Sequence, residues 1–277
     1  MIREMPPFSE ISSPQNPRIK DLARLREGKH RRRAGLYVVE GLRELERALA
    51  GGVTFASLYV CEECWLAAEY KPLAEKIAAL QGVESFSLSK SAFEKASNRE
   101  NPDGLLAVAQ MQKTGLDTLK LSATPFLLLI EHVEKPGNLG TLLRSADAAG
   151  ADAVIVTDPV TDLYSPQAIL ASQGSIFALP TVFADNEEAK EFFQTHGIKP
   201  FAATPHTERL LWELNLRQPT ALLLGSEADG LSGFWMDDPQ TLRAKIPMSG
   251  NAADSLNVSA AAAIFLFEVV RQRQTTK

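Results

Sequence analysis

The sequence predicts an α/β protein with two domains, and three observations carry this prediction. Short apolar runs alternate with helical segments along the chain, a pattern typical of sheets covered by helices. In the C-terminal half the runs are apolar on consecutive positions, as in strands buried on both faces of a mostly parallel sheet. Residues 112–125 lack clear periodicity and are predicted to form a linker. We therefore expect a small N-terminal α/β domain over residues 1–111 and a C-terminal domain over residues 126–277.

The N-terminal domain is expected to begin with a short amphipathic helix. Asn16 is a predicted N-cap, Pro17 takes the first helical position, and the apolar spacing ends before Gly28. A second helix is predicted over residues 42–50, where two glycines stop it. The strands of this domain are expected at residues 36–40, 55–60, 83–88 and 105–110.

Two later helices of this domain are predicted from proline and capping signals. A helical stretch that ends at Gly82 is expected to be interrupted at Pro72. Ser91 and Glu94 have the spacing of a capping box, which predicts the start of another short helix at Ser91.

The C-terminal domain contains six apolar runs separated by helical segments. These runs lie at residues 126–130, 153–156, 176–182, 200–203, 221–224 and 244–247. A last apolar stretch, Val258 to Phe267, is much shorter than the roughly 20 residues that span a bilayer. We interpret it as a buried helix.

Composition argues against several classes of protein. The first 13 residues carry charges and two prolines instead of the apolar core of a signal peptide, so we expect a cytoplasmic protein without a membrane segment. Cys61 and Cys64 are too few for a disulfide framework. Their spacing allows a redox pair, but a structural role at the end of an apolar run fits better. The four histidines lack metal-ligand spacing, so no metal is expected, and only His132 lies beside a glycine loop.

Charge is unevenly distributed along the chain. The formal net charge is −5 and the pI about 5.5, which argues against a uniformly basic surface for nucleic acid. Eight basic and two acidic residues nevertheless fall between Pro17 and Arg33, so this stretch carries +6 and the rest of the chain −11. Such a cluster is a candidate contact for RNA phosphates; the alternative is a solvated helix face with a solubilising loop. The candidate contacts are Arg18, Lys20, Lys29, Arg31, Arg32 and Arg33.

Three loops follow apolar runs in the C-terminal half, at residues 136–140, 225–230 and 246–257. The second has the glycine frame of a phosphate-binding loop, but Leu231 stands where that loop needs lysine. Its acidic residues suit a cationic or amine-bearing ligand better than a triphosphate. The sequence has neither a Gly-x-Gly-x-x-Gly fingerprint nor a Gly-x-Ser-x-Gly elbow. Because open α/β sheets bind ligands beyond the carboxyl ends of their strands, we expect these loops to form the site.

The loop sequences resemble motifs of the SpoU branch of the SPOUT superfamily, RNA 2′-O-ribose methyltransferases that use S-adenosylmethionine. The similar segments are PGNLGTLLRSADAAG at 136–150, LLLGSEADGLS at 222–232 and IPMSGNAADSLNVSAA at 246–261. The N-terminal segments NPRIKDLARL and VVEGLRELERAL resemble the substrate-binding domain that precedes many such enzymes. The resemblance therefore covers nearly the whole chain.

This resemblance implies a trefoil knot in the C-terminal domain, a homodimer, and methylation of ribosomal RNA of the 23S type. The S-adenosylmethionine pocket it implies is lined by Leu224, Gly225, Glu227, Gly230, Ile246, Met248, Leu256 and Asn257. The residues that match its catalytic positions are Asn138, Arg144, Ser255 and Asn257. Lys135 departs from the family, which commonly has an acidic or neutral residue there.

Alternatives for these residues stay open at the level of sequence. The family residue at Arg144 is proposed to help deprotonate the ribose hydroxyl, but arginine is effectively always protonated, so orientation of phosphate and stabilisation of an oxyanion are at least as plausible. Asn138 and Ser255 would orient the ribose or Arg144, or else only cap helices. The chain could also be a non-catalytic RNA-binding protein that keeps the fold. Retention of the matched catalytic residues and of Glu227 favours the enzyme.

Overall fold

The chain folds into two compact units. The computed structural model describes residues 8–112, 114–250 and 256–274. The N-terminal unit contains the residues up to Gln112 together with the segment Tyr164–Ala178, and the C-terminal unit contains the rest. That segment was not expected in the N-terminal unit. The domain bounds at 1–111 and 126–277 stay a prediction.

The N-terminal unit is built on a five-stranded mixed sheet with strand order β1-β4-β3-β5-β2. Strands β1, β4 and β3 run parallel, and β5 pairs antiparallel with both β3 and β2. The strands are β1 (Ser9–Ile11), β2 (Leu36–Glu40), β3 (Phe55–Val60), β4 (Glu84–Leu88) and β5 (Leu105–Gln110).

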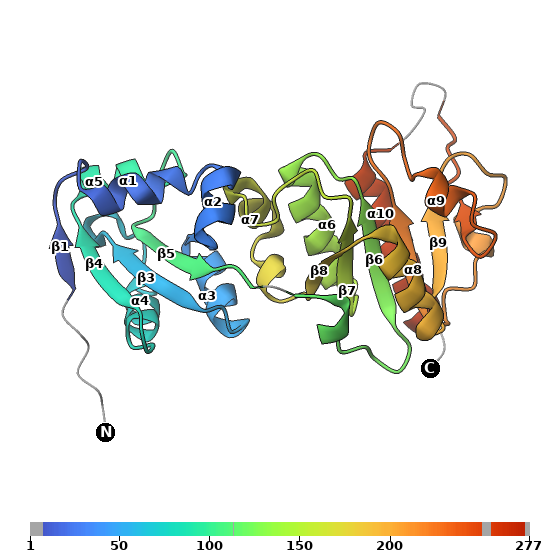
Figure 1. The fold of residues 1–277 in the computed structure, drawn as a ribbon, viewed down its shortest axis with the longest axis horizontal. Helices are drawn as coiled ribbons and strands as arrows, with labels where there is room; N and C mark the ends of the chain where they lie inside the picture. Colours follow the sequence, from blue (N-terminus) through green and yellow to red (C-terminus); the bar gives the residue numbers. More distant parts are fainter. Residues whose placement is uncertain (1–7, 113, 251–255, 275–277) are drawn as a thin grey trace. The chain divides into compact units, whose positions relative to one another are not determined.

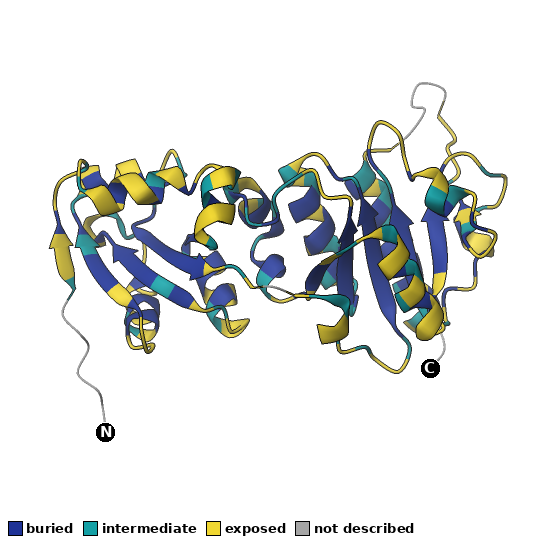
Figure 2. Cartoon of the chain, in the orientation of Figure 1, coloured by how far each residue is buried: buried dark blue, intermediate teal, exposed yellow. Residues whose placement is uncertain are grey.

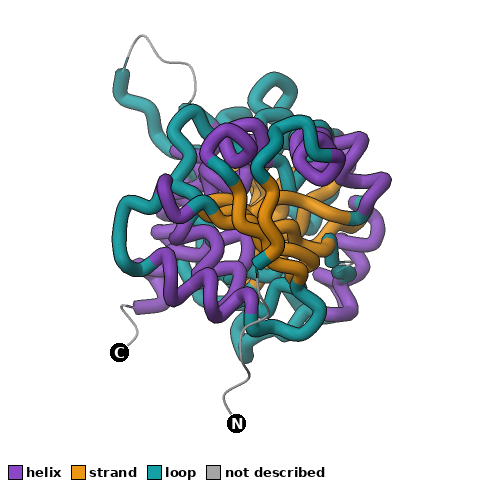
Figure 3. Tube along the Cα trace, turned by 90° about the vertical axis from the view of Figure 1, so that its left-hand side faces the viewer, coloured by secondary structure: helices purple, strands orange, loops and turns teal. Residues whose placement is uncertain are grey.

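Helices cover both faces of this sheet (Figure 1). One face carries α1 (Pro17–Arg24) and α5 (Lys90–Ala96), whose apolar side chains share one core with the strands. The other carries α3 (Leu42–Ala50) and α4 (Tyr70–Ala78). Figure 3, in which this unit faces the viewer, shows the strands at the centre and helices around them. The shorter elements are α2 (Gly28–Ala34), α7 (Pro166–Ser172) and the 3-10 turns at Glu62–Cys64 and Ser175–Phe177.

Three local expectations for this unit were wrong or incomplete. Helix α5 is capped by Ser89, whose Oγ accepts from the Ala92 amide at 3.3 Å, so the capping box at Ser91 is incorrect. Pro72 lies in the first turn of α4 and does not interrupt it, because a proline there sacrifices no helical hydrogen bond. The basic residues after Gly28 form helix α2 instead of a loop.

The C-terminal unit contains a six-stranded sheet with order β11-β9-β10-β6-β7-β8, and every pairing in it is parallel. This confirms the parallel sheet predicted from consecutive apolar positions. Figure 2 shows its central strands as buried. The strands are β6 (Phe126–Glu131), β7 (Ala153–Thr157), β8 (Thr181–Ala184), β9 (Lys199–Ala203), β10 (Thr220–Leu224) and β11 (Leu242–Ala244).

Two helices lie on each face of this sheet (Figure 1). Helices α8 (Asn186–Thr195) and α9 (Gly233–Met236) share a core with one face. Helices α6 (Pro136–Ala148) and α10 (Val258–Gln274) pack together on the other. The 3-10 turns of this unit are Leu116–Thr118 and Leu211–Glu213. Because the strands are parallel, the loops after β6, β10 and β11 emerge at one edge.

Two predicted strand positions need correction. The apolar run 176–182 begins in a 3-10 turn of the N-terminal unit, and strand β8 starts only at Thr181, after Pro180. The run 244–247 is displaced, since β11 ends at Ala244. Among the described residues, none of the helices combines the length and apolar character needed to cross a membrane.

Candidate functional site

One carboxylate joins the three predicted loops at the carboxyl edge of the parallel sheet. Glu227, in the loop after β10, accepts hydrogen bonds from the side-chain amide of Asn138 and from that of Asn257, the latter at 3.1 Å. Its second oxygen lies 2.5 Å from Nζ of Lys135. Lys135 immediately precedes α6, Asn138 lies in the first turn of that helix, and Asn257 immediately precedes α10. The site predicted from three separate loops is therefore assembled around one acidic side chain.

The loop that carries Glu227 is a tight turn closed by its own backbone. The amide of Ser226 donates to the carbonyl of Gly230 at 3.0 Å, and the Gly230 amide returns the bond at 3.2 Å. Gly230 has φ +71°, a conformation that favours glycine. A Cβ on Gly225 would lie 1.9 Å from the carbonyl carbon of Gly230. Both glycines are therefore required by the geometry of the turn.

Asn138 and Asn257 hold different positions relative to their helices. The N-cap of α6 is Lys135 and Pro136 is the first helical residue, so Asn138 is not a cap and that alternative is wrong. Asn257 accepts a hydrogen bond from the Ser259 amide at 2.9 Å while its Nδ2 donates to Glu227. It therefore caps α10 and contributes to the site at once. Ser259 Oγ also donates to the Asn138 carbonyl at 3.4 Å, which links the two helix starts.

Lys135 has a clear electrostatic role despite its departure from the family pattern. The hydrogen bond to Glu227, followed by the charge of that carboxylate, raises the pKa of Lys135 above its usual value. The pair keeps an ammonium beside the carboxylate at neutral pH. Sequence reasoning noted Lys135 as an oddity but missed it as a site residue. Its position directly before Pro136, at the start of the first loop motif, was the available signal.

His132 and Asp158 lie at the carboxyl ends of neighbouring strands β6 and β7. Both adopt positive φ, +55° and +46°, which is uncommon for residues other than glycine. His132 Nδ1 lies 2.8 Å from the Asp158 carboxylate, and this hydrogen bond is the largest cause that raises the pKa of His132. His132 thus belongs to an ion pair beside the site.

The other predicted site residues lie at different depths. Arg144 is exposed on α6, and Leu224 is buried at the end of β10. Ile246 is half-buried, whereas Met248 and Leu256 are 42% and 37% exposed. Ser255 lies outside the described residues, so its predicted role is not addressed by the structure.

Some cations of the basic stretch bond to groups within the N-terminal unit, and several lie at exposed positions. Arg31 is only 3% exposed, and its guanidinium donates to the carbonyls of Leu25 and Arg26, both at 2.7 Å. Arg18 pairs with Glu84 at 2.9 Å and lies over the ring of Phe86. Arg18 nevertheless lies at an exposed position of α1, and the other exposed candidates on α1 and α2 are Lys20, Lys29, Arg32 and Arg33.

The cysteine pair lies in the N-terminal unit, away from the three loops along the chain. The two sulfurs of Cys61 and Cys64 are 3.3 Å apart, and both cysteines are free. Burial is the main cause that raises the pKa of Cys61 to about 12. A thiol that stays protonated is a poor nucleophile, which favours the structural interpretation.

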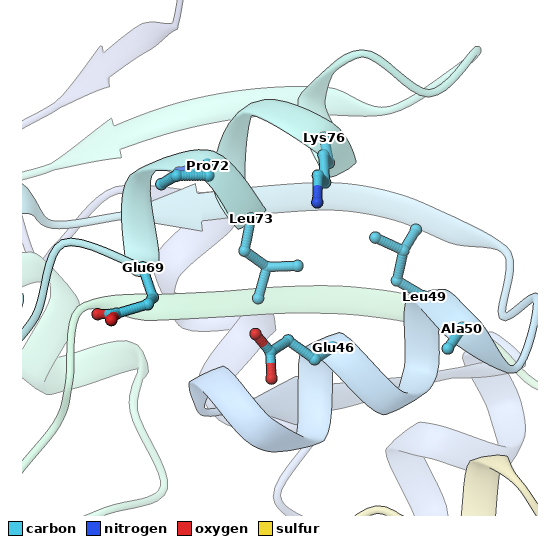
Figure 4. Close-up of a pocket in the computed structure, with 7 residues that line it drawn as sticks. All are labelled: Glu46, Leu49, Ala50, Glu69, Pro72, Leu73 and Lys76. Atoms are coloured by element: carbon cyan, nitrogen blue, oxygen red, sulfur yellow. The ribbon is translucent and has the colours of Figure 1, made fainter.

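A hollow of about 350 Å³ lies between α3 and α4 in the N-terminal unit (Figure 4). Leu49 and Leu73 form its floor, with Glu46 and Lys76 beside them. None of the residues predicted for catalysis, cofactor binding or RNA binding lines it. Within the described parts of the chain, no group of three or more His, Cys, Asp or Glu side chains is arranged to hold a metal ion.

The fold and the candidate site together define an α/β protein with glycine-containing loops at the carboxyl edge of a parallel sheet, where such sheets commonly bind ligands. The chain belongs to the SpoU rRNA methylase family, which it matches over residues 125–267. Residues 16–107 match an MRM3-like substrate binding domain.

Curated relatives align over nearly the full chain. A 23S rRNA (uridine(2479)-2′-O)-methyltransferase of Streptomyces viridochromogenes is 30% identical and covers 98% of this chain and 95% of its own length. The 23S rRNA (guanosine(2553)-2′-O)-methyltransferase RlmP of Bacillus subtilis is 28% identical, with 95% and 99% covered. The names of both relatives specify 2′-O-methylation of 23S rRNA, but at a guanosine in one and a uridine in the other.

Solved structures agree with this assignment. An RNA 2′-O ribose methyltransferase is 44% identical and superposes with a TM-score of 0.81, covering 96% of this chain and 99% of that one. An AdoMet-bound rRNA methyltransferase from Sinorhizobium meliloti is 28% identical, with a TM-score of 0.86 and 95% and 98% covered.

Proposed function

We propose that this protein transfers the methyl group of S-adenosylmethionine to a ribose 2′-hydroxyl of 23S rRNA in the cytoplasm. The observation that carries the proposal is the placement of Glu227 in the loop after β10, where it bonds to Lys135 and Asn138 at the start of α6 and to Asn257 before α10. The names of the relatives support the molecule and the ribose position. Their different nucleotides leave the modified base of this protein's substrate to experiment.

The residues at this edge fit S-adenosylmethionine. The turn from Gly225 to Gly230 is packed on itself at Gly225, whereas the Cβ position of Gly230 has open space around it, so glycine leaves the backbone uncovered there. Met248 and Leu256 keep apolar surface exposed beside it, and the carboxylates of Glu227 and Asp229 suit a ligand with amino and sulfonium charges. The proposed lining is Leu224, Gly225, Glu227, Gly230, Ile246, Met248, Leu256 and Asn257.

When bound, S-adenosylmethionine would supply a methyl group on a cationic sulfur, and the ribose hydroxyl that receives it would release its proton to water. Catalysis then depends mainly on holding the hydroxyl oxygen in line. Asn138 is fixed by Glu227 and is proposed to orient the ribose. The exposed guanidinium of Arg144 is proposed to hold the adjacent phosphate and to stabilise negative charge developing on the oxygen. Ser255 keeps its predicted role in orienting the ribose.

The N-terminal unit is proposed to grip the RNA. Lys20, Lys29, Arg32 and Arg33 place four cationic side chains on the surface of α1 and α2, within the segment that matches a substrate binding domain. Neutralised phosphates release counterions, which gives affinity without sequence preference. Arg31 is left out of this surface because its donors are used inside the unit.

The homodimer and the trefoil knot are part of the proposal. Phe267 on α10 is 49% exposed, an apolar side chain that a second copy could cover. Light scattering of the purified protein tests this: we expect twice the mass of one chain, and a monomer at micromolar concentration would contradict it.

The direct test of the activity is transfer of labelled methyl groups to unmodified 23S rRNA in vitro. After digestion to nucleosides, the label is expected in a 2′-O-methylated nucleoside. The alternative of a non-catalytic RNA-binding protein predicts salt-sensitive RNA binding without any transfer. Label in a methylated base would contradict the ribose as acceptor.

A further inference from the structure

Glu131 is a buried carboxylate at the carboxyl end of β6 that the mechanism above does not use. It is 3% exposed. One oxygen accepts from the Ser232 amide at 2.6 Å, and the other accepts from Ser232 Oγ at 2.7 Å and from Nδ2 of Asn186 at 2.6 Å. All three donors are neutral groups. A buried carboxylate is costly unless its lone pairs are satisfied, and here three hydrogen bonds do so.

The orientation of Asn186 is fixed from its other side. Its oxygen accepts from Nε1 of Trp235 at 3.0 Å, and Trp235 is fully buried. An indole nitrogen only donates, so the Asn186 amide must turn its NH₂ group toward Glu131. The Ser232 backbone amide likewise can only donate. Each oxygen of Glu131 therefore faces a group that can do nothing but donate.

These donors require a side chain at position 131 that accepts hydrogen bonds on both of its terminal atoms. A glutamine at 131 would place its NH₂ either against the Ser232 amide or against the NH₂ of Asn186. Both orientations set donor against donor and leave a buried polar group unsatisfied. A carboxylate, which accepts on both oxygens, satisfies all three donors.

The network connects Glu131 to the turn that carries Glu227. Ser232 follows that turn by two residues, and strands β6 and β10 are hydrogen-bonded neighbours. Ser232 occupies the N-cap position of α9 but makes no side-chain capping bond there; its hydroxyl donates to Glu131 instead. The N-terminal end of the 225–230 turn, its near end, is thus held by strand β10. Its C-terminal end, the far end, is held through Ser232 by Glu131, the last residue of the neighbouring strand β6.

We propose that Glu131 is a positioning residue that fixes the far end of the 225–232 loop through Ser232, and so sets the shape of the S-adenosylmethionine site. Asn186 and Trp235 complete the network by holding the third donor in place. The inference rests on the proposed function, since it assigns this loop to the cofactor.

The first test is Glu131→Gln in the full-length protein. Titration calorimetry with S-adenosylmethionine is expected to show affinity reduced about tenfold or more, the change produced by one lost charge-assisted hydrogen bond. Hydrogen exchange without cofactor is expected to be faster in residues 226–232 than in the wild type, since the loop has lost its anchor. Glu191→Gln, the same chemical change at an exposed position of α8, is the matched control and should change neither measurement.

The second test is a rescue that a general loss of stability would not allow. Asn186→Asp alone places two carboxylates against each other, so cofactor affinity is expected to fall. In the double variant Glu131→Gln/Asn186→Asp, the glutamine NH₂ can donate to the carboxylate introduced at position 186, and the glutamine oxygen can accept from Ser232. The introduced carboxylate can still accept from Trp235. We expect the double variant to bind the cofactor more tightly than either single variant.

The outcomes separate this inference from the proposed function. Wild-type protein that methylates RNA while Glu131→Gln binds the cofactor and protects its loop equally well overturns the positioning role alone. A double variant that is no better than the worse single variant also overturns it, and remains informative if Glu131→Gln folds poorly. Wild-type protein that does not bind S-adenosylmethionine overturns both. Wild-type protein that binds it without methylating RNA overturns only the proposed reaction.

Discussion

Arg31 in the N-terminal unit and Glu227 in the C-terminal unit use their charges in opposite ways. In the N-terminal unit, Arg31 donates to backbone carbonyls, and Arg99 reaches Glu44 at 3.1 Å and Asp103 at 3.2 Å. In the C-terminal unit, Glu227 holds polar side chains together at the edge of the sheet, with its own side chain 28% exposed. The difference teaches that the density of charge in a sequence does not locate a site. What decides is whether the fold leaves the charge facing solvent or turns it toward its own backbone.

The largest expected effect concerns Arg144, an exposed cation of the C-terminal unit. Arg144→Ala should lower the rate of methyl transfer about 100-fold or more, in the range measured when one oxyanion donor is removed. Cofactor affinity should stay unchanged, since Arg144 lies outside the proposed cofactor lining. Single-turnover transfer and calorimetry measure the two quantities. Transfer at the wild-type rate would remove Arg144 from the catalytic residues.

Arg31 offers the sharpest contrast, because it is a cation used for folding. Arg31→Ala should reduce the free energy of unfolding by about 2–4 kcal/mol, since the buried carbonyl of Leu25 and the part-buried carbonyl of Arg26 lose a charged donor. Arg33→Ala, at an exposed position two residues away, should change it by less than about 0.5 kcal/mol. Urea denaturation compares them. Equal free energies of unfolding for the Arg31→Ala and Arg33→Ala variants would contradict a role for Arg31 in stabilising the fold.

The exposed cations of the same stretch should affect RNA instead of stability. Replacing Lys29, Arg32 and Arg33 by alanine together should weaken RNA binding and flatten its dependence on salt, because fewer counterions are released. Filter binding over a range of salt concentrations measures both, and S-adenosylmethionine binding by the same variant is the control. If the triple variant keeps the wild-type RNA affinity and salt dependence, Lys29, Arg32 and Arg33 do not form the RNA contact.

The smallest effect is a dependence on pH at His132. Its pKa is raised in the folded protein, chiefly by the hydrogen bond to Asp158, so the pair stabilises the fold below the ordinary histidine pKa of about 6.5 and loses this contribution as pH rises through the raised value. Asp158→Asn should therefore lower the melting temperature at pH 5.5 more than at pH 9. A difference in melting temperature between wild type and Asp158→Asn that grows as pH rises would contradict the pairing of His132 with Asp158.

Much of the fold follows from local sequence because burial on both faces of a sheet leaves a local signature. The runs that became β6, β7, β9 and β10 are apolar at consecutive positions, and glycines follow where the chain must turn tightly. The run 176–182 misled because its apolar residues serve a 3-10 turn and then a strand, with Pro180 between them. The apolar character of residues 176–182 alone does not show where the 3-10 turn ends and the strand begins.

The site was only partly predictable, since its decisive interactions join distant parts of the chain. Glu227 meets Asn138 and Lys135, which lie 89 and 92 residues away, and no local pattern encodes such a pair. The family resemblance supplied Asn138 and Glu227 but not Lys135 or Glu131. Arg31 and Arg33 are the same residue type in the same short helix. Only the packing of α2 makes one a structural residue and leaves the other exposed.

The most direct test of the central claim is mapping of 2′-O-methyl groups in the ribosomal RNA of a strain that lacks this gene. We expect one 23S rRNA ribose to lose its methyl group and to regain it when the wild-type gene is restored, but not with the Arg144→Ala variant. An identical 2′-O-methylation map in the deletion strain and its parent would contradict the account.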